Sequence, residues 1–143
     1  MRPSALMDAI AAQIEAIDPA DTQSAVDRFA RVTGRQSEDA LNGRRLFALR
    51  WSDPLPMIPA DTSIGCTRYA AGLELVIAYA DTAAGQGRLG DDSEKIATTL
   101  AQLSRTIPAA NIANLELSAN AETGSIEGAA LATYTITLEF TGG

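Results

Sequence analysis

The sequence predicts an α+β domain in which one mostly antiparallel β-sheet of four to five strands carries two helices on one face. Two stretches repeat apolar residues at helical spacing, several others alternate apolar with polar residues, and glycine- or proline-rich turns separate them. A chain of 143 residues corresponds to a single domain, 1–143, which can bury about two-thirds of its unfolded surface. The elements follow in the order helix, short strand, two strands, helix and two strands, for which one sheet with helices on one face is the economical packing.

The first helix is expected over Ser4–Ile17. Its apolar residues recur every three or four positions, and Ser4 can cap its first turn. Asp18 ends the helix, because a residue that precedes proline avoids the helical region. The polar stretch that follows fits either a short helix or a short strand, and we favour a short strand around Phe29 between two loops.

Two further strands are expected in the first half of the chain. Arg45–Trp51 alternates, so that its large apolar side chains share one face. In residues 52–61, three prolines fall within six positions, and we predict an extended surface loop without a strand. Tyr69–Tyr79 is the strongest strand, and apolar or small residues on both of its faces predict a central position in the sheet.

The second half of the chain predicts one helix and a hairpin. The helix is expected over Asp92–Arg105, with Asp91 and Glu94 at the spacing of a capping box. The strands Ile112–Ala119 and Ala130–Phe140 then form a long antiparallel hairpin, and two glycines in their connection allow its turn. Threonines alternate with apolar residues in the last strand. This threonine face is either solvated or an interface, and the sequence does not decide between the two.

The composition removes several classes of functional site. The chain has no histidine and a single cysteine, Cys66, which excludes histidine-dependent nucleophilic sites, imidazole metal ligands and an internal disulfide. Carboxylates remain available for an acid–base pair or a metal site. However, no spacing brings Asp53, Asp61 and the pair Asp91–Asp92 together, and we interpret them as solvated turn residues. We therefore predict no catalytic residue, no metal site and no cofactor.

The charged residues indicate protein contacts rather than membrane or nucleic-acid binding. The formal net charge of -7 repels duplex DNA on average. No apolar run approaches the ~20 residues that cross a bilayer. The arginines cluster at Arg44–Arg45 and at Arg28, Arg31 and Arg35, with acidic residues among them, which is typical of surface ion pairs or a subunit interface. Trp51 fits either the core or an interface anchor.

One glycine-rich stretch matches the G-x-G-x-x-G pattern of dinucleotide-binding loops. Gly85, Gly87 and Gly90 supply the glycines, but four residues separate them from the preceding strand. Asp91 and Asp92 would stand where a phosphate must bind at the helix N-terminus, and two carboxylates repel it. We therefore predict a mobile loop between strand and helix, not a nucleotide site.

The layout resembles the tail-terminator family of tailed bacteriophages over most of the chain. The similarity rests on an opening helix, a strand with a proline loop, a long strand followed by an open loop and a helix, and a closing hairpin. The sequences concerned are "SALMDAIAAQIEAI", "RRLFALRWSDPLP", "GLELVIAYAD" with "DDSEKIATTLAQLSR", and "IANLELSANAETGS" with "LATYTITLEF". The stretch from Ala20 to Arg44 departs from this layout, because it is polar and weakly patterned.

The resemblance implies a virion structural protein without enzymatic activity, located in the phage tail or neck and assembled in the host cytoplasm. It would form a homo-oligomeric ring, usually hexameric, that caps the tail tube, joins it to the head-tail connector or neck protein, and lets DNA pass through its lumen. Closed rings need a different patch on each side of the subunit. We expect the partner contacts to involve Trp51, Pro54, Pro56, Arg44, Arg45, Gly87, Arg88 and Gly124.

The sequence is also compatible with other functions. Another neck or tail-completion protein would share the same size and layout. From different classes, a small enzyme that uses only carboxylates and a ligand-binding module with an apolar pocket are the alternatives.

Overall fold

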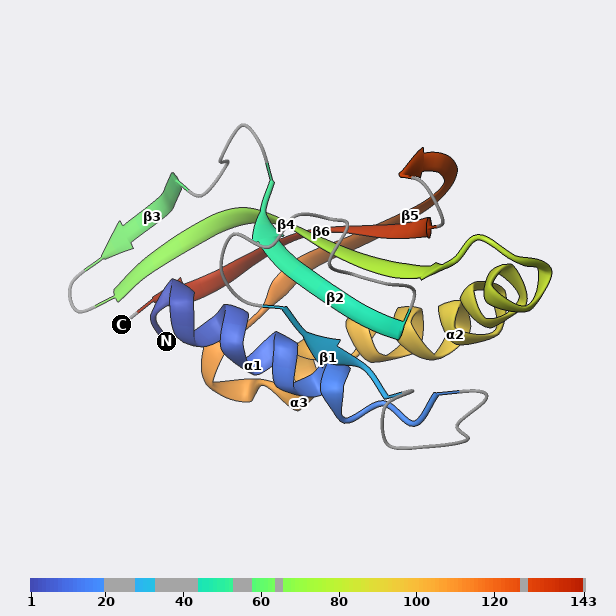
Figure 1. The fold of residues 1–143 in the computed structure, drawn as a ribbon. Coiled ribbons are helices and arrows are strands. Elements are labelled where there is room, and N and C mark those ends of the chain that lie inside the picture. Colours follow the sequence, from blue (N-terminus) through green and yellow to red (C-terminus); the bar gives the residue numbers. More distant parts are fainter. Residues whose placement is uncertain (20–27, 33–43, 53–57, 64–65, 127–128, 143) are drawn as a thin grey trace.

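The structure is a computed structural model, and it describes residues 1–19, 28–32, 44–52, 58–63, 66–126 and 129–142. A single twisted sheet forms one layer, and the helices form a second layer beneath it (Figure 1). The predicted α+β class with two main helices on one face is therefore confirmed. None of the described helices is both long and apolar enough to span a bilayer.

The elements follow one another with short connections over most of the chain. In order they are α1 (Pro3–Glu15), β1 (Ala30–Arg31), β2 (Arg44–Trp51), β3 (Ile58–Ser63), β4 (Cys66–Ala80), α2 (Ala83–Ala101), α3 (Leu103–Thr106), the 3-10 turn η3 (Pro108–Ala110), β5 (Ala113–Ile126) and β6 (Ala129–Gly142).

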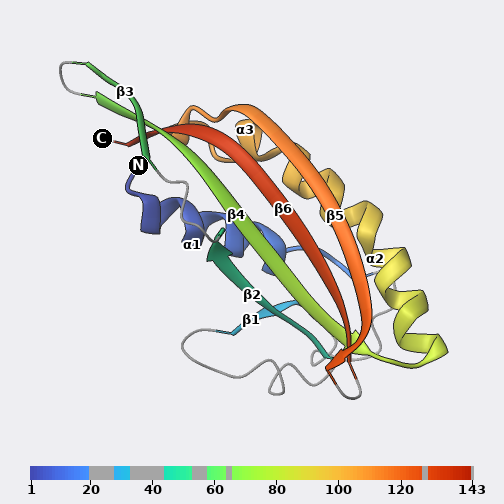
Figure 2. The ribbon, with the colours of Figure 1, turned by 90° about the horizontal axis from the view of Figure 1, so that it is seen from above.

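Strand β4 is the centre of the sheet. The strand order is β1-β2-β4-β6-β5, and β3 also pairs with β4, at the end that β2 does not reach. All the pairings are antiparallel except the short parallel pairing of β1 with β2. Seen from above, β1 and β5 therefore lie at opposite edges of the sheet (Figure 2).

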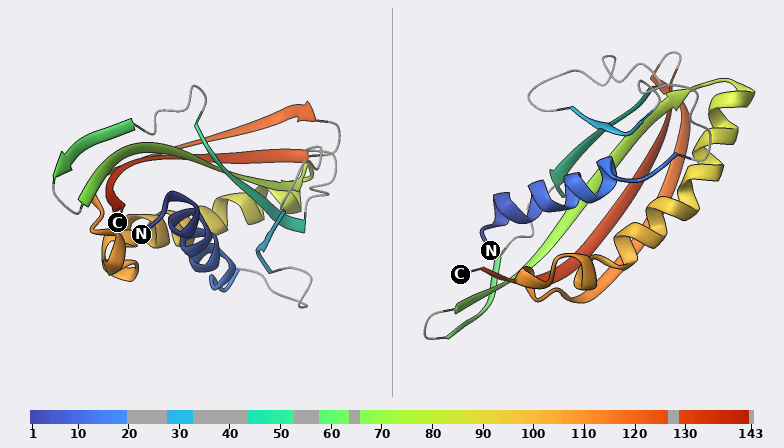
Figure 3. Two further views of the ribbon diagram at one scale, coloured as in Figure 1. Left: turned by 90° about the vertical axis from the view of Figure 1, so that its left-hand side faces the viewer. Right: turned by 90° about the horizontal axis from the view of Figure 1, so that it is seen from below.

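The main core lies between the sheet and the helices. Leu6, Ile10 and Ile14 of α1 are fully buried. Ile96 and Leu100 of α2 are fully buried as well. Each such side chain contributes about 1.5–3 kcal/mol when it leaves water. From below, α1 lies on the β2 side of the sheet and α2 runs along β5 and β6 (Figure 3). The helical repeat in the sequence therefore predicts the buried faces correctly.

The other face of the sheet carries no described helix. Thr133 and Thr135 of β6 are partly exposed there and Thr137 is exposed. A small apolar cluster of Val76, Ala78 and Leu131 lies at one end of this face. The threonine face is thus polar over most of its length, with an apolar end.

Three of the predicted element boundaries are wrong. Helix α2 begins at Ala83, nine residues before the predicted start at Asp92, so Asp91 and Glu94 form no capping box. Residues 58–61 belong to strand β3, although we predicted a loop; Pro59 is tolerated because β3 pairs only with β4 and leaves its other edge without a described partner. Strand β5 extends to Ile126, through the predicted turn residue Gly124, with a register shift between Thr123 and Ile126.

Candidate functional site

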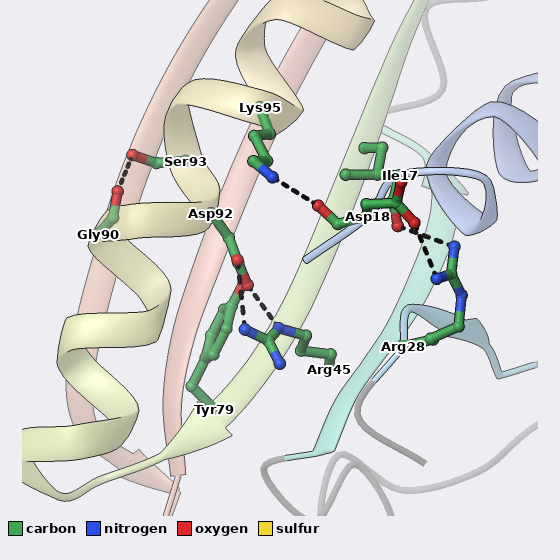
Figure 4. A network of polar contacts seen from close by, with 9 residues as sticks. All are labelled: Ile17, Asp18, Arg28, Arg45, Tyr79, Gly90, Asp92, Ser93 and Lys95. Carbon is green, nitrogen blue, oxygen red and sulfur yellow. Dashed lines mark hydrogen bonds and ion pairs between the residues drawn. The ribbon is translucent and has the colours of Figure 1, made fainter. Parts of the chain in front are cut away.

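The most concentrated polar chemistry in the described residues lies inside the molecule, between α2 and the sheet (Figure 4). The guanidinium of Arg45 donates from Nε to Oδ2 of Asp92 at 2.6 Å, and from a terminal nitrogen to Oδ1 at 3.3 Å. The hydroxyl of Tyr79 donates to the same Oδ2 at 3.0 Å. Arg45 is 2% exposed and Asp92 is 0% exposed. The three residues form a buried, charge-assisted network, hereafter the Arg45–Asp92–Tyr79 cluster.

Local backbone geometry brings these residues together. Asp92 belongs to the buried stripe of α2, four residues before Ile96, so the helix directs it toward the sheet. Arg45 lies at a register shift in β2 and has a φ of 58°, a left-handed conformation that costs a non-glycine residue about 1–2 kcal/mol. The Arg45 side chain lies on the helix side of the sheet, the side on which Phe47 and Leu49 of the same strand are buried. Its guanidinium also lies over the ring of Phe29, 5.9 Å from the centroid.

The environment of the cluster disfavours further negative charge. Burial, and then the charge of the Asp92 carboxylate, raise the pKa of Tyr79 well above its usual value of 10.0; its hydrogen bond to Asp92 acts in the same direction. Burial and Asp92 also raise the pKa of Tyr134 to about 12. Both phenols are therefore neutral at physiological pH, and the hydroxyl of Tyr79 acts as a hydrogen-bond donor to Asp92.

The cluster is closed to solvent and connects elements of the fold. A substrate would have to contact Arg45 or Asp92, yet neither presents a useful surface to solvent. What the cluster does is join β2, β4 and α2 through one carboxylate. The interpretation of Asp92 as a solvated turn residue is wrong, and so is the placing of Arg45 among the partner contacts, because both are buried in the same ion pair.

Polar contacts at the surface connect several other charged groups. Arg28 donates to the carboxylate of Asp18 at 2.9 Å, and Lys95 of α2 donates to the backbone carbonyl of Asp18 at 2.8 Å (Figure 4). Arg31 reaches Asp8 of α1 at 2.7 Å. The prediction of surface ion pairs for Arg28 and Arg31 is confirmed; Arg35 lies outside the described residues.

A scan against models of protein families finds no match, and neither does a search of curated proteins. Among the described residues, no group of three or more cysteine, aspartate or glutamate side chains is placed to hold a metal ion.

The glycine-rich stretch is helical. Residues 83–90 form the first two turns of α2, so the predicted mobile loop is wrong. The hydroxyl oxygen of Thr82 caps the helix by accepting a hydrogen bond from the amide of Gly85 at 3.1 Å. Packing explains the glycine at position 85, because a Cβ there would overlap the carbonyl oxygen of Ala80. Gly87 and Gly90 have nothing near their missing Cβ atoms.

The other predicted contact residues are scattered. Trp51 is half-buried at the end of β2 and packs against the main core. Gly87 is exposed and Arg88 is half-buried. Both belong to α2, whose main contacts with the sheet are to β4, β5 and β6. Arg44 begins β2 and Gly124 lies in β5. Pro54 and Pro56 lie outside the described residues, as does Asp53. The structure does not gather these residues into one patch.

Sequence reasoning missed the partnership between Arg45 and Asp92. One signal was available: Asp92 continues the spacing of the apolar stripe of α2 backward from Ile96 and Leu100. A charged residue on a buried stripe predicts a buried partner of opposite charge, although the sequence does not identify which one.

A hollow of about 170 Å³ lies beside the cluster, between α2 and the β5–β6 hairpin. Its lining is almost wholly apolar and consists of Leu89, Ser93, Ala119, Asn120, Ala121, Ala132 and Tyr134. This volume is below the roughly 300–1,000 Å³ of sites for drug-sized ligands. The hollow therefore gives little support to a ligand-binding module.

The strands at the two edges of the sheet differ in their charged residues. The strands at one edge, β1 and β2, contain four arginines and no acidic residue, and three of them pair with carboxylates of other elements. The strand at the other edge, β5, contains Glu116 and Glu122 and no basic residue, and both side chains are exposed. Among the described strands, none pairs with the outer edge of β5. This long edge, together with the sheet face that carries no described helix, is a surface that the described residues leave available for a partner.

Proposed function

We propose that the protein is a virion structural protein of the tail-terminator type, which works by self-association into a ring of six copies and by steric contact with the tail tube. The observation that carries this proposal is the long outer edge of β5, which no described strand covers and whose two glutamates contrast with the arginines of β1 and β2 at the other edge. Two different edges on one subunit are what a head-to-tail ring requires.

The buried position of the polar cluster supports the same proposal. The best-formed ion pair in the described residues is closed to solvent, so its chemistry is used to fix α2 against the sheet. A rigid subunit loses little conformational entropy on docking, which favours assembly. The ring then covers the growing end of the tube and blocks the addition of tube subunits, while its other side faces the head connector or neck protein.

The net charge is compatible with a passage for DNA. A subunit with a formal net charge of -7 repels the phosphate backbone on average, so DNA passes through the lumen without being held.

The test is assembly in solution and on tubes. Size-exclusion chromatography with light scattering is expected to give a hexamer, either with the purified protein alone or after addition of preformed tail tubes. In a tube-elongation assay, the protein is expected to stop growth at substoichiometric amounts relative to tube subunits. A protein that stays monomeric in both settings and leaves elongation unchanged contradicts the proposal.

A further inference from the structure

The backbone pairing determines which residues present unused hydrogen-bonding groups at each edge. In an antiparallel ladder, the N–H and C=O of one residue point to the same side, and the side alternates along the strand. The amide of Val32, next to β1, donates to the carbonyl of Phe47, and the amide of Ser52 donates to Gly72 of β4. The backbone N–H and C=O groups of the odd-numbered residues of β2 therefore point away from β4. Beyond Phe47, whose carbonyl bonds Val32, these residues are Leu49 and Trp51, with which no described strand pairs on that side.

The same alternation continues across the sheet to β5. The backbone N–H and C=O groups of the even-numbered residues of β4 point to β2. Those of its odd-numbered residues therefore point to β6, where Leu75 pairs with Tyr134. The odd-numbered residues of β6 then face β5, where Thr135 pairs with Ser118. It follows that Leu117, Ala119 and Ala121 of β5 direct their N–H and C=O groups outward.

We propose that the outer edge of β5 pairs, in the antiparallel sense, with the outer edge of β2 in a second copy of this chain. This inference rests on the proposed ring function and names its subunit interface. The contact joins the backbone of Leu117–Ala121 to that of Leu49–Trp51 in the next copy, so that the sheet continues from one subunit to the next.

The strand directions agree with this pairing. Successive antiparallel steps from β2 through β4 and β6 to β5 give β2 and β5 opposite directions. When a second copy extends the sheet in the same orientation, its β2 therefore meets β5 antiparallel. The outward residues of both strands carry their side chains on the helix face, so the helices of the two copies lie on the same side.

The charges favour this pairing over the pairing of β5 with itself. Around Ala119, an antiparallel β5–β5 contact places Glu116 opposite Glu122, and like charges directly across two strands are destabilising. On β2, Arg50 points to the face that carries no described helix, with 61% of its side chain exposed. It uses Nε to bond Glu74 at 2.8 Å, which leaves its terminal nitrogens for a carboxylate such as Glu122 of the next copy.

The middle of β5 is open to the approach of another strand. No lysine or proline interrupts it, and Ser118, Ala119, Asn120 and Ala121 are small and exposed. Small side chains let another backbone approach closely. The register shifts of β5 lie near its ends, outside the segment Glu116–Thr123, which leaves a regular edge between them.

The decisive variant is Ala119→Pro, which removes an outward N–H without removing a bond to β6. The matched control is Ala119→Val, which keeps the N–H and favours a strand. We expect Ala119→Pro to abolish assembly measured by light scattering and Ala119→Val to leave it unchanged, with both monomers folded by circular dichroism. Equal assembly of the two variants would overturn the proposed interface while leaving the ring function intact.

A charge exchange tests the partner strand and does not depend on the folding of the proline variant. Glu122→Arg and Arg50→Glu alone are each expected to raise the dissociation constant for assembly about two- to fivefold, the range of an exposed ion pair. The double variant Glu122→Arg/Arg50→Glu should recover part of that loss. Additive losses in the double variant would overturn the pairing of β5 with β2. A wild-type protein that never self-associates, with or without tubes, would overturn the proposed function as well.

Discussion

A carboxylate without exposed surface needs polar partners inside the protein, and Asp92 has two of them on different strands. Arg45 supplies the opposite charge and Tyr79 supplies a neutral donor. Removing one partner of a buried pair leaves the other charge without compensation, which is more costly than the net value of the pair itself.

We therefore predict that Asp92→Asn lowers the free energy of unfolding by about 3–5 kcal/mol. The neighbouring Asp91 is exposed on the same helix turn and gives a control with the same change in charge. Asp91→Asn should stay within about 0.5 kcal/mol of wild type. Urea denaturation followed by circular dichroism measures both values, and similar losses for the two variants would show that the pair contributes little.

The raised pKa values of Tyr79 and Tyr134 make stability depend on alkaline pH. Between the usual pKa of 10.0 and the folded value of about 12 for Tyr134, the unfolded chain releases protons that the folded chain keeps. The contribution of the two neutral tyrosines to the free energy of unfolding is therefore fully present below pH 10. It is lost as the pH rises, by up to about 1.4 kcal/mol per pH unit for each tyrosine. Urea denaturation across this window should show the decline, and Tyr134→Phe should make it shallower; an unchanged slope in that variant would contradict the assignment.

At the scale of elements, α2 shows how a helix forms from an unfavourable sequence. Three glycines lie in its first two turns, and each costs about 1 kcal/mol relative to alanine in a helix interior. The Thr82 cap and the close contact of Gly85 with Ala80 compensate for this cost.

The glycines of α2 should therefore respond to alanine in opposite directions. Gly87→Ala and Gly90→Ala lie at open positions and are expected to stabilise the protein by about 0.5–1 kcal/mol each. Gly85→Ala is expected to destabilise it, because the added methyl group overlaps a backbone carbonyl. Thermal unfolding of the three variants decides the point; a gain in the melting temperature for Gly85→Ala would show that the backbone there adjusts freely.

Local patterns predict an element where its own side chains determine its conformation. The alternation in β2, β4 and β6 and the helical repeat of α1 are of this kind, and these elements are found within a few residues of their predicted bounds. The start of α2 and the strand β3 are decided by contacts instead. Gly85 packs against Ala80, and Pro59 is held in register opposite Tyr69 of β4.

The candidate site was less predictable for the same reason. Arg45 and Asp92 are 47 positions apart, and they meet only because the fold packs α2 against the sheet. No local pattern encodes such a contact. The charge difference between the sheet edges, in contrast, can be read from the sequence once the strand order is known.

At the scale of the whole molecule, β4 limits how the sheet can open. It pairs with β2 and β3 on one side and with β6 on the other. In hydrogen exchange, the amides of Leu73–Ile77 should therefore exchange only through global unfolding, whereas those of the two-residue strand β1 exchange much faster. Faster exchange in β4 than in β1 would show that the sheet separates along its centre.

The position of Trp51 makes the proposed contact visible without a label. It is the only tryptophan in the chain, and it is half-buried. Its backbone N–H and C=O groups point away from β4, toward the outer edge of β2. When a second copy occupies that edge, the indole loses contact with water, so its fluorescence emission should shift to shorter wavelength as the protein concentration rises. The native protein therefore contains its own spectroscopic reporter of subunit association.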